Sequence, residues 1–162
     1  METANRTVDF DFAGRARTAY CPAAAVFDIY DHFPGANGDI IGATGYLEPT
    51  RDGWDAACWL LAEFCRWGEI LRRQRGEAPQ PLLTVSELAV ADVAEASRLR
   101  DIVSQTLRLA FVRFDPDPEP DEVDLVLQEI EAERKKAPPR GLLGRLTSRR
   151  RPGSGDSARP TP

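Results

Sequence analysis

The fold of this chain is decided by one apolar stretch near its middle, Trp54-Asp55-Ala56-Ala57-Cys58-Trp59-Leu60-Leu61-Ala62-Glu63-Phe64-Cys65-Arg66-Trp67. Its large side chains recur at helical spacing and cover a wide stripe, which is typical of a helix at the centre of a core. Thr50 or Asp52 is suited to cap the first turn, and we expect the helix to run to about Arg73.

The face opposite that stripe is predicted to point outward. It carries Glu63 and Arg66, together with the large apolar residues Trp59 and Ile70. Exposed aromatic side chains often anchor protein interfaces, so these four residues are the predicted partner-binding surface. The alternative is that Trp59 packs against another segment of the same chain.

The residues before this helix predict a small β-hairpin and a short helix. Val8, Phe10 and Phe12 alternate with polar residues, which indicates a half-buried strand, and Ala13-Gly14 provides a tight turn into Arg15–Tyr20. A hairpin alone is marginal in water, so we expect helices to cover its Phe10 and Phe12 face. A helix is predicted from Pro22 to about His32, whereas Asp39–Leu47 stays unassigned.

The residues after it predict three more helical segments. Thr84 and Glu87 fit a capping box at a helix start, and a long amphipathic helix is expected from about Asp92 to Phe114. Residues 121–136 form a further amphipathic helix with acids at its start and bases at its end. Whether this last helix docks on the body or awaits a partner is left open.

These elements predict a mainly α fold with a small N-terminal β-hairpin, a helical bundle-like core and a disordered C-terminal tail. The expected divisions are a compact helical domain at 1–114, an acidic proline linker at 115–120, the helix at 121–136 and the tail at 137–162. The tail is rich in Pro, Gly, Ser and Arg and holds too few apolar residues to offset the entropy of ordering it.

Charge is distributed unevenly along the chain. Residues 134–162 hold nine basic residues against one acidic residue, a net charge of +8, whereas residues 1–133 hold twelve basic against 25 acidic residues, a net charge of −13. An acidic body repels polyanions, so we expect no nucleic-acid binding except through the basic tail. A regulatory or adaptor module that uses this tail on nucleic acid is one alternative function.

Composition also bears on location. Hydrophobic residues make up 42% of the chain and charged residues 29%, as in water-soluble proteins. No stretch approaches the roughly 18 uncharged apolar residues of a membrane helix, and charges within 1–13 disfavour a secretory signal. We therefore expect no membrane partner and a cytoplasmic location.

Few side chains are suited to catalysis or metal binding. His32 is the single histidine and Cys21, Cys58 and Cys65 are the three cysteines, so no zinc-finger or paired-histidine spacing exists. We expect a non-enzyme with no catalytic residue, cofactor or metal. Asp28 and Asp31, beside His32, are interpreted as the solvated face of a helix.

The cysteines allow one alternative. Cys58 and Cys65 lie two turns apart on the apolar stripe and are predicted to fill the core. Cys21 precedes Pro22 at a helix start, where a thiol pKa can be lowered, so a Cys21-dependent enzyme or redox protein is the second alternative function. His32, its one possible base, lies at the far end of the same predicted helix.

The order of these elements resembles a known family. The hairpin Val8–Tyr20 leads into Ala23–Phe33, then the central Trp54–Cys65 helix, and Gln80–Thr84 before the second long helix. This order, over about residues 6–133, is similar to that of the small tail assembly chaperones of tailed bacteriophages and prophages, of the type made before a translational frameshift.

The resemblance implies a protein-binding function. A member of this family binds the tape-measure protein during tail assembly in the host bacterial cytoplasm, keeps its long apolar helices from aggregating and helps to recruit tail-tube subunits. The tape-measure protein and the tail-tube subunits are therefore the expected partners. The resemblance assigns no role to the basic tail.

Overall fold

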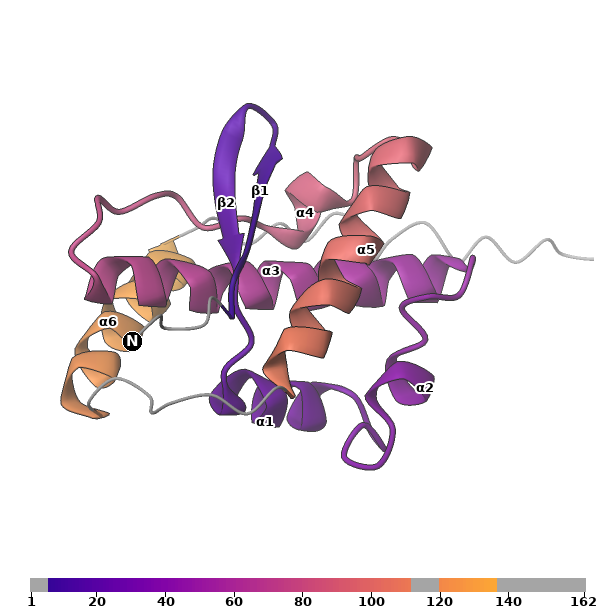
Figure 1. Cartoon of the computed structure of the whole chain (residues 1–162), viewed down its shortest axis with the longest axis horizontal. Coiled ribbons are helices and arrows are strands. Elements are labelled where there is room, and N and C mark those ends of the chain that lie inside the picture. Colours follow the sequence, from indigo (N-terminus) through magenta and orange to yellow (C-terminus); the bar gives the residue numbers. More distant parts are fainter. Residues whose placement is uncertain (1–5, 112–119, 137–162) are drawn as a thin grey trace, which may run out of the picture.

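A 24-residue helix, α3 (Arg51–Gln74), runs through the middle of the molecule, and every other layer is arranged around it (Figure 1). The computed structural model describes residues 6–111 and 120–136. Thr50 caps α3 by accepting a hydrogen bond from the Gly53 N–H at 3.1 Å, as the sequence predicted. Gly53 is required here, because a Cβ at this position would lie 2.6 Å from the carbonyl oxygens of Gly45 and Glu48.

The N-terminal hairpin stands across one side of α3. It consists of β1 (Val8–Phe12) and β2 (Arg15–Ala19), paired antiparallel with Phe12 opposite Arg15. Ala13 and Gly14 both have positive φ, at 50° and 74°, which is the conformation of a two-residue turn that matches strand twist. The predicted hairpin is therefore confirmed, with Ala13 in a conformation that L-residues rarely adopt.

The hairpin sits very close to α3. The Tyr20 N–H donates to the Phe64 carbonyl at 3.0 Å, and a Cβ on Gly68 would lie 1.9 Å from the Thr18 carbonyl oxygen. Gly68 thus permits the backbone of β2 to pack directly on the backbone of α3.

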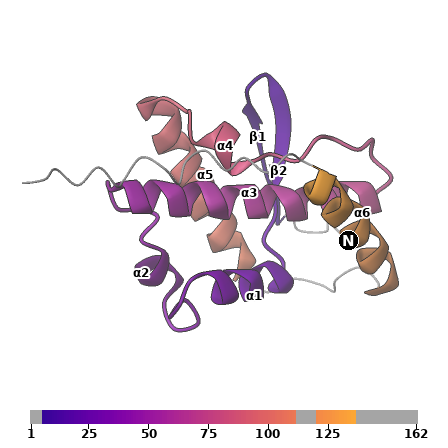
Figure 2. The same cartoon turned by 180° about the vertical axis from the view of Figure 1, so that it is seen from behind.

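Two helices lie on the other side of α3, away from the hairpin, as both views show (Figure 1 and Figure 2). α1 (Ala23–His32) agrees with its prediction, and the unassigned stretch 39–47 contains a short helix, α2 (Ile40–Thr44). Asp39 caps α2 by accepting from the Gly42 N–H, and Gly45 ends it in the left-handed conformation.

The next two helices meet on the side of α3 that carries the hairpin (Figure 1). α4 (Val85–Leu88) begins at the predicted capping box. The Thr84 side chain accepts from the Glu87 N–H, and the Glu87 side chain accepts from the Thr84 N–H. α5 (Val93–Ala110) crosses α3 and ends before the predicted Phe114. Its buried side is formed by Leu99, Ile102, Val103, Thr106 and Leu107.

α6 (Pro120–Lys136) lies against the C-terminal end of α3, so the question left open by the sequence is resolved in favour of docking (Figure 1). Ile130 is completely buried there, and Val126 and Leu127 are partly buried beside the core. The predicted linker at 115–120, apart from Pro120, and the predicted tail at 137–162 lie outside the described residues.

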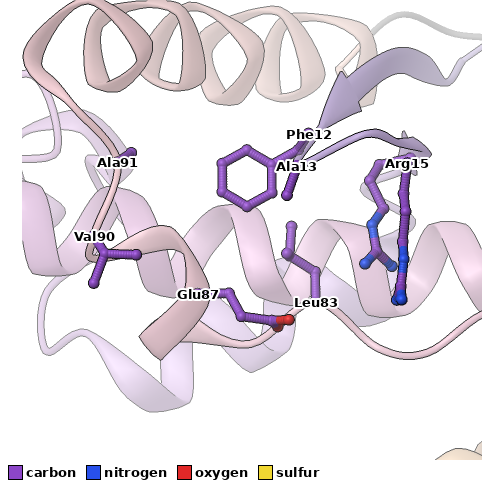
Figure 3. Close-up of a pocket in the computed structure, with 8 residues that line it drawn as sticks. Phe12, Ala13, Arg15, Leu83, Glu87, Val90 and Ala91 are labelled. Carbon is purple, nitrogen blue, oxygen red and sulfur yellow. The ribbon is translucent and has the colours of Figure 1, made fainter.

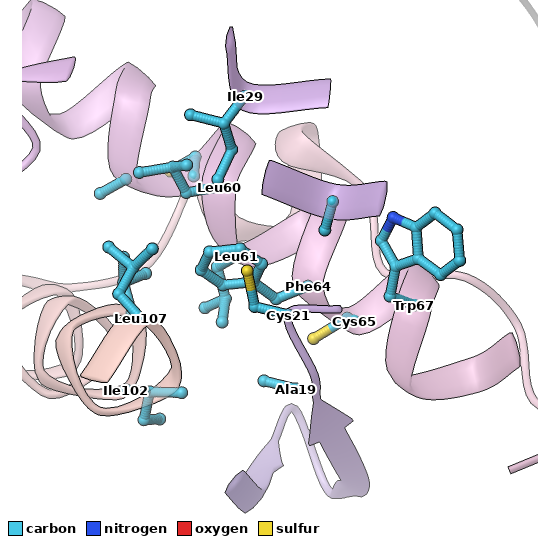
Figure 4. Close-up of a cluster of buried hydrophobic side chains, with 14 of the residues drawn as sticks. Ala19, Cys21, Ile29, Leu60, Leu61, Phe64, Cys65, Trp67, Ile102 and Leu107 are labelled. Atoms are coloured by element: carbon cyan, nitrogen blue, oxygen red, sulfur yellow. The ribbon is translucent and has the colours of Figure 1, made fainter. Parts of the chain in front are cut away.

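The core is a cluster of side chains from β2, α1, α3, α5 and the segments between them (Figure 4). Phe64, Leu60 and Leu61 of α3 lie at its centre, with Ile29 of α1 on one side and Leu107 of α5 on another. The chain is therefore mainly helical with a two-stranded N-terminal hairpin, as predicted. None of the helices in the described ranges has the length and apolar character needed to cross a membrane.

Candidate partner-binding site

The structure first locates the four residues predicted to bind a partner. Trp59 is half-buried, and its indole stacks on the His32 imidazole with ring centroids 4.0 Å apart and planes 11° from parallel. Phe33 meets the same indole edge-on at 5.3 Å. Trp59 therefore packs against the end of α1, which is the alternative that the sequence left open.

Glu63 and Arg66 were expected on an exposed face, and this expectation is wrong. Both are buried, and the Arg66 Nε donates to a Glu63 carboxylate oxygen at 2.8 Å. The Arg66 Nη2 reaches Asp28 of α1 at 3.0 Å, and the Trp67 indole N–H donates to the same carboxylate oxygen at 3.2 Å. Arg66, which is paired with Glu63 within α3, therefore connects α3 to α1 through Asp28.

Ile70 was also expected to point outward, and it is 2% exposed. All residues from 63 to 70 are buried, because this half of α3 is surrounded by several elements rather than lying on one side of a simple helix pair. Helical periodicity identifies the face of a helix that points toward the core. It does not reveal that other elements of the chain also cover the opposite face. The predicted partner-binding set is thus internal, apart from the half-buried Trp59.

Arg73, near the end of α3, anchors α6. Its Nη1 and Nη2 donate to the two carboxylate oxygens of Glu133 at 3.2 and 3.3 Å, and Glu129 lies 3.6 Å from Nη1. Its Nε donates to Glu69 at 2.8 Å. Burial lowers the pKa of Arg73, but Glu69 and Glu133 together outweigh this effect and raise it above its ordinary value. A buried guanidinium is fully compensated here by acids, two of them from α6.

A polar pocket of about 400 Å³ lies between α1, α3 and α6. Its walls include Asp31, which is exposed as predicted, the exposed His32, and Asp28, which instead turns toward Arg66. Burial, and then the neighbouring Glu63, raise the pKa of Asp28 against the lowering effects of Trp67 and Arg66. The charges that line this pocket include acids from α1 and α6 and the paired Arg66.

The cysteines are buried core residues. Cys58 and Cys65 lie in the apolar cluster as predicted. The prediction that a helix start lowers the pKa of Cys21 is wrong, because burial, with smaller effects from Asp28 and Glu63, raises the pKa of this thiol to about 12. Cys21 is 5% exposed, so its environment disfavours the reactive thiolate.

A second pocket, which the sequence did not reveal, opens beside the hairpin tip and holds about 390 Å³ (Figure 3). Phe12 and Ala13 come from the tip, and Leu83, Val90 and Ala91 come from the segments around α4. Figure 3 shows Phe12 near the centre, with Val90 and Ala91 on one side and Arg15 on the other. Pockets of this size and apolar character are typical of sites that receive a partner's side chain or a small ligand.

Arg17 contributes to the wall of this pocket and is 8% exposed. The two-residue turn fixes the register of the hairpin and therefore the face to which Arg17 points. Arg17 lies opposite Phe10, so both side chains point to the same, covered face of the hairpin. This register is readable from Ala13-Gly14 in the sequence, and it would have indicated a buried arginine. The guanidinium donates from Nη1 to the Pro81 carbonyl, whereas its Nε has no hydrogen-bond partner within the described part of the chain.

Apolar side chains next to this pocket are exposed to an unusual degree. Val90 is 83% exposed and Val93 is 89% exposed, and Val85 of α4 is also exposed. Val90 is itself part of the pocket wall, and it lies in the short segment between α4, which begins at Val85, and α5, which begins at Val93. We define the pocket and these three valines as the corner site.

Within the described ranges, 6–111 and 120–136, no group of three His, Cys, Asp or Glu side chains is placed to hold a metal ion. The basic tail that the alternative nucleic-acid function requires lies outside those ranges. Scans of this chain against protein-family models, curated proteins and solved structures found no match.

Proposed function

We propose that this chain is a non-enzymatic tail assembly chaperone that binds the tape-measure protein and keeps it from aggregating while a phage or prophage tail is assembled. Its proposed place of action is the host bacterial cytoplasm, and tail-tube subunits are proposed as further partners. The order of the hairpin and helices is the basis of the resemblance, and the described fold has that order.

The observation that carries the proposal is the corner site. Exposed valines on a folded body, beside a pocket with apolar walls, provide a surface on which an apolar helix can be shielded from water. The site is small, so its contacts are suited to weak binding that later assembly steps displace. The acidic body, at −13 over residues 1–133, helps to keep such a complex dispersed.

Co-expression tests the proposal. The chain carries an affinity tag and is produced with the large tape-measure-like protein expected from a neighbouring gene, and both the soluble fraction and the pulled-down fraction of that protein are measured. We expect the chain to raise the soluble fraction and to co-purify with the partner. An insoluble partner that never co-purifies contradicts the proposal.

Matched variants connect the result to the corner site. The double variant Val90→Asp with Val93→Asp places charge on the exposed corner, and we expect it to lose co-purification while remaining folded. Leu125→Asp, at a position that is 70% exposed on α6, is the control and should bind as the unchanged chain does. Equal loss in both variants would show that the corner site has no special part.

A further inference from the structure

The corner site contains a buried positive charge without a counter-charge. Arg17 is nine-tenths buried, its Nε has no hydrogen-bond partner, and it takes part in none of the ion pairs formed by residues 6–111 and 120–136. Removing a guanidinium from water is costly unless a carboxylate compensates it. The site therefore lacks one anionic group.

Two carboxylates nearby do not supply that group. Glu87, also in the pocket wall, is the capping residue of α4, and its Oε2 accepts from both the N–H and the hydroxyl of Thr84 at 2.8 Å. Asp9, on the other strand, accepts from the Thr18 hydroxyl at 2.7 Å. Arg15 adds a second, exposed positive charge to the pocket, so a partner's acid would meet two arginines.

The molecule itself shows what kind of segment satisfies such a surface. At the other end of α3, α6 buries Ile130 and, three residues later, gives the carboxylate of Glu133 to Arg73. An apolar side chain and an acid one turn apart on a helix thus cover apolar surface and compensate an arginine together. The corner site likewise has uncovered apolar surface and an arginine without a carboxylate partner. No segment in the described part of the chain covers this surface or supplies the carboxylate.

Charge decides which segment is suited to the site. The chain's own residues 137–162 carry six basic residues and one acidic residue, Asp156, so they bring the wrong charge to Arg15 and Arg17. We propose that the corner site binds a helix of the partner protein that carries an apolar side chain and an Asp or Glu three or four residues apart. The apolar side chain lies against Phe12, Leu83 and Val90, and the carboxylate pairs with Arg17.

This inference rests on the proposed function, and peptides from the partner test it. Overlapping peptides that cover the tape-measure-like protein are labelled, and their binding to the full chain is measured by fluorescence anisotropy at low and moderate salt. We expect the bound peptides to contain the apolar–acid spacing. Replacing that acid by Gln or Asn should weaken binding by roughly tenfold or more, since a charge-assisted pair is lost.

Variants of the chain complete the test. Arg17→Gln should remove the preference for the acidic peptide over its neutral counterpart, and Val90→Asp, at an exposed position, should weaken both peptides without unfolding the chain. Leu125→Asp is the matched control. Circular dichroism establishes that each variant is folded, and Val90→Asp keeps the test decisive if Arg17→Gln does not fold.

The outcomes separate this inference from the function on which it rests. Co-purification of the whole partner that is indifferent to Arg17→Gln and Val90→Asp overturns the inference and leaves the chaperone function standing. Absence of both co-purification and peptide binding overturns both. A concentration-dependent dimer that Val90→Asp abolishes would identify a second copy as the occupant and would likewise overturn the inference.

Discussion

Two regions of this molecule combine apolar side chains with buried arginines, and they differ in what covers them. At the C-terminal end of α3, Arg73 is compensated by Glu69, Glu129 and Glu133, and α6 covers the surface with Ile130. At the corner site, Arg17 has a carbonyl partner and no carboxylate partner among the residues that the structure describes, and Val90 and Val93 are exposed. The chain itself covers the first region, whereas the described residues leave the corner site uncovered, and we propose that a partner covers it.

The difference shows why a functional surface is easily misplaced from sequence. Glu63, Arg66 and Ile70 are typical of an interface when they are placed on an isolated helix, yet in the fold they belong to the interface of α3 with its own neighbours. Exposed apolar residues that no element covers are a better indication of a partner.

The largest effect is expected where the hairpin meets α3. Gly68→Ala places a Cβ 1.9 Å from the Thr18 carbonyl oxygen, and this backbone atom can move only if the hairpin moves. We expect a loss of about 3 kcal/mol or more in the free energy of unfolding, measured by urea denaturation. The corner site should be lost with the hairpin.

Gly38→Ala is the control for this substitution, because a Cβ there meets no atom within 4 Å and the glycine has no positive φ. It should change stability by less than about 0.5 kcal/mol. Equal stability of the Gly68→Ala variant and the unchanged chain would show that β2 does not lie against α3 as described.

The next effect concerns the covered region. Ile130→Ala removes the side chain through which α6 is buried, and a loss of about 2–4 kcal/mol is expected for an isoleucine in a packed site. Urea denaturation measures it, and Leu125→Ala on the exposed side of α6 is the matched control. If both variants unfold alike, α6 is not anchored by Ile130.

A smaller effect is expected at the hairpin tip. Ala13 has φ 50°, a conformation in which glycine lacks the steric cost of a Cβ, although glycine also loses more entropy on folding. We expect Ala13→Gly to stabilise the chain by up to about 1 kcal/mol in thermal or urea unfolding. A clear destabilisation would contradict the two-residue turn that positions Arg17 beside the pocket.

The smallest effect is a dependence on pH at the contact between α1 and α3. Because burial raises the pKa of Asp28, the folded chain binds its proton more tightly than the unfolded chain, and stability contributed by this group falls as pH rises from about 3.8 through the raised value. Asp28→Asn removes this titration. The stability of the unchanged chain relative to Asp28→Asn should therefore decline between pH 4 and pH 7, and a rise over that interval would reverse the sign.

Much of the fold follows from local sequence signals. The alternation of Val8, Phe10 and Phe12, the cap at Thr50 and the capping box at Thr84 each satisfy local backbone or burial needs, and each predicted element is present. α2 was missed because its five residues are too few to show a helical period, although Asp39 and Gly45 provide the capping residues at its ends.

The site was less predictable because it depends on which surfaces meet. Helical spacing correctly placed Phe64 and Leu61 in the core, yet it could not show that α1 would reach Arg66 or that α6 would fold back onto Arg73. Arg17 could have been found from the hairpin register. The exposure of Val90 and Val93 could not have been predicted from the sequence. It depends on how α4 and α5 pack near the hairpin tip.

Amide hydrogen exchange tests the central contrast most directly. Exchange of the full chain is measured by mass spectrometry with and without the tape-measure-like protein. We expect the partner to slow exchange in residues 12–17 and 83–93, around the corner site, and to leave exchange in residues 124–136 of α6 unchanged. Slower or faster exchange confined to α6 and the end of α3, with no change around the corner site, would contradict it.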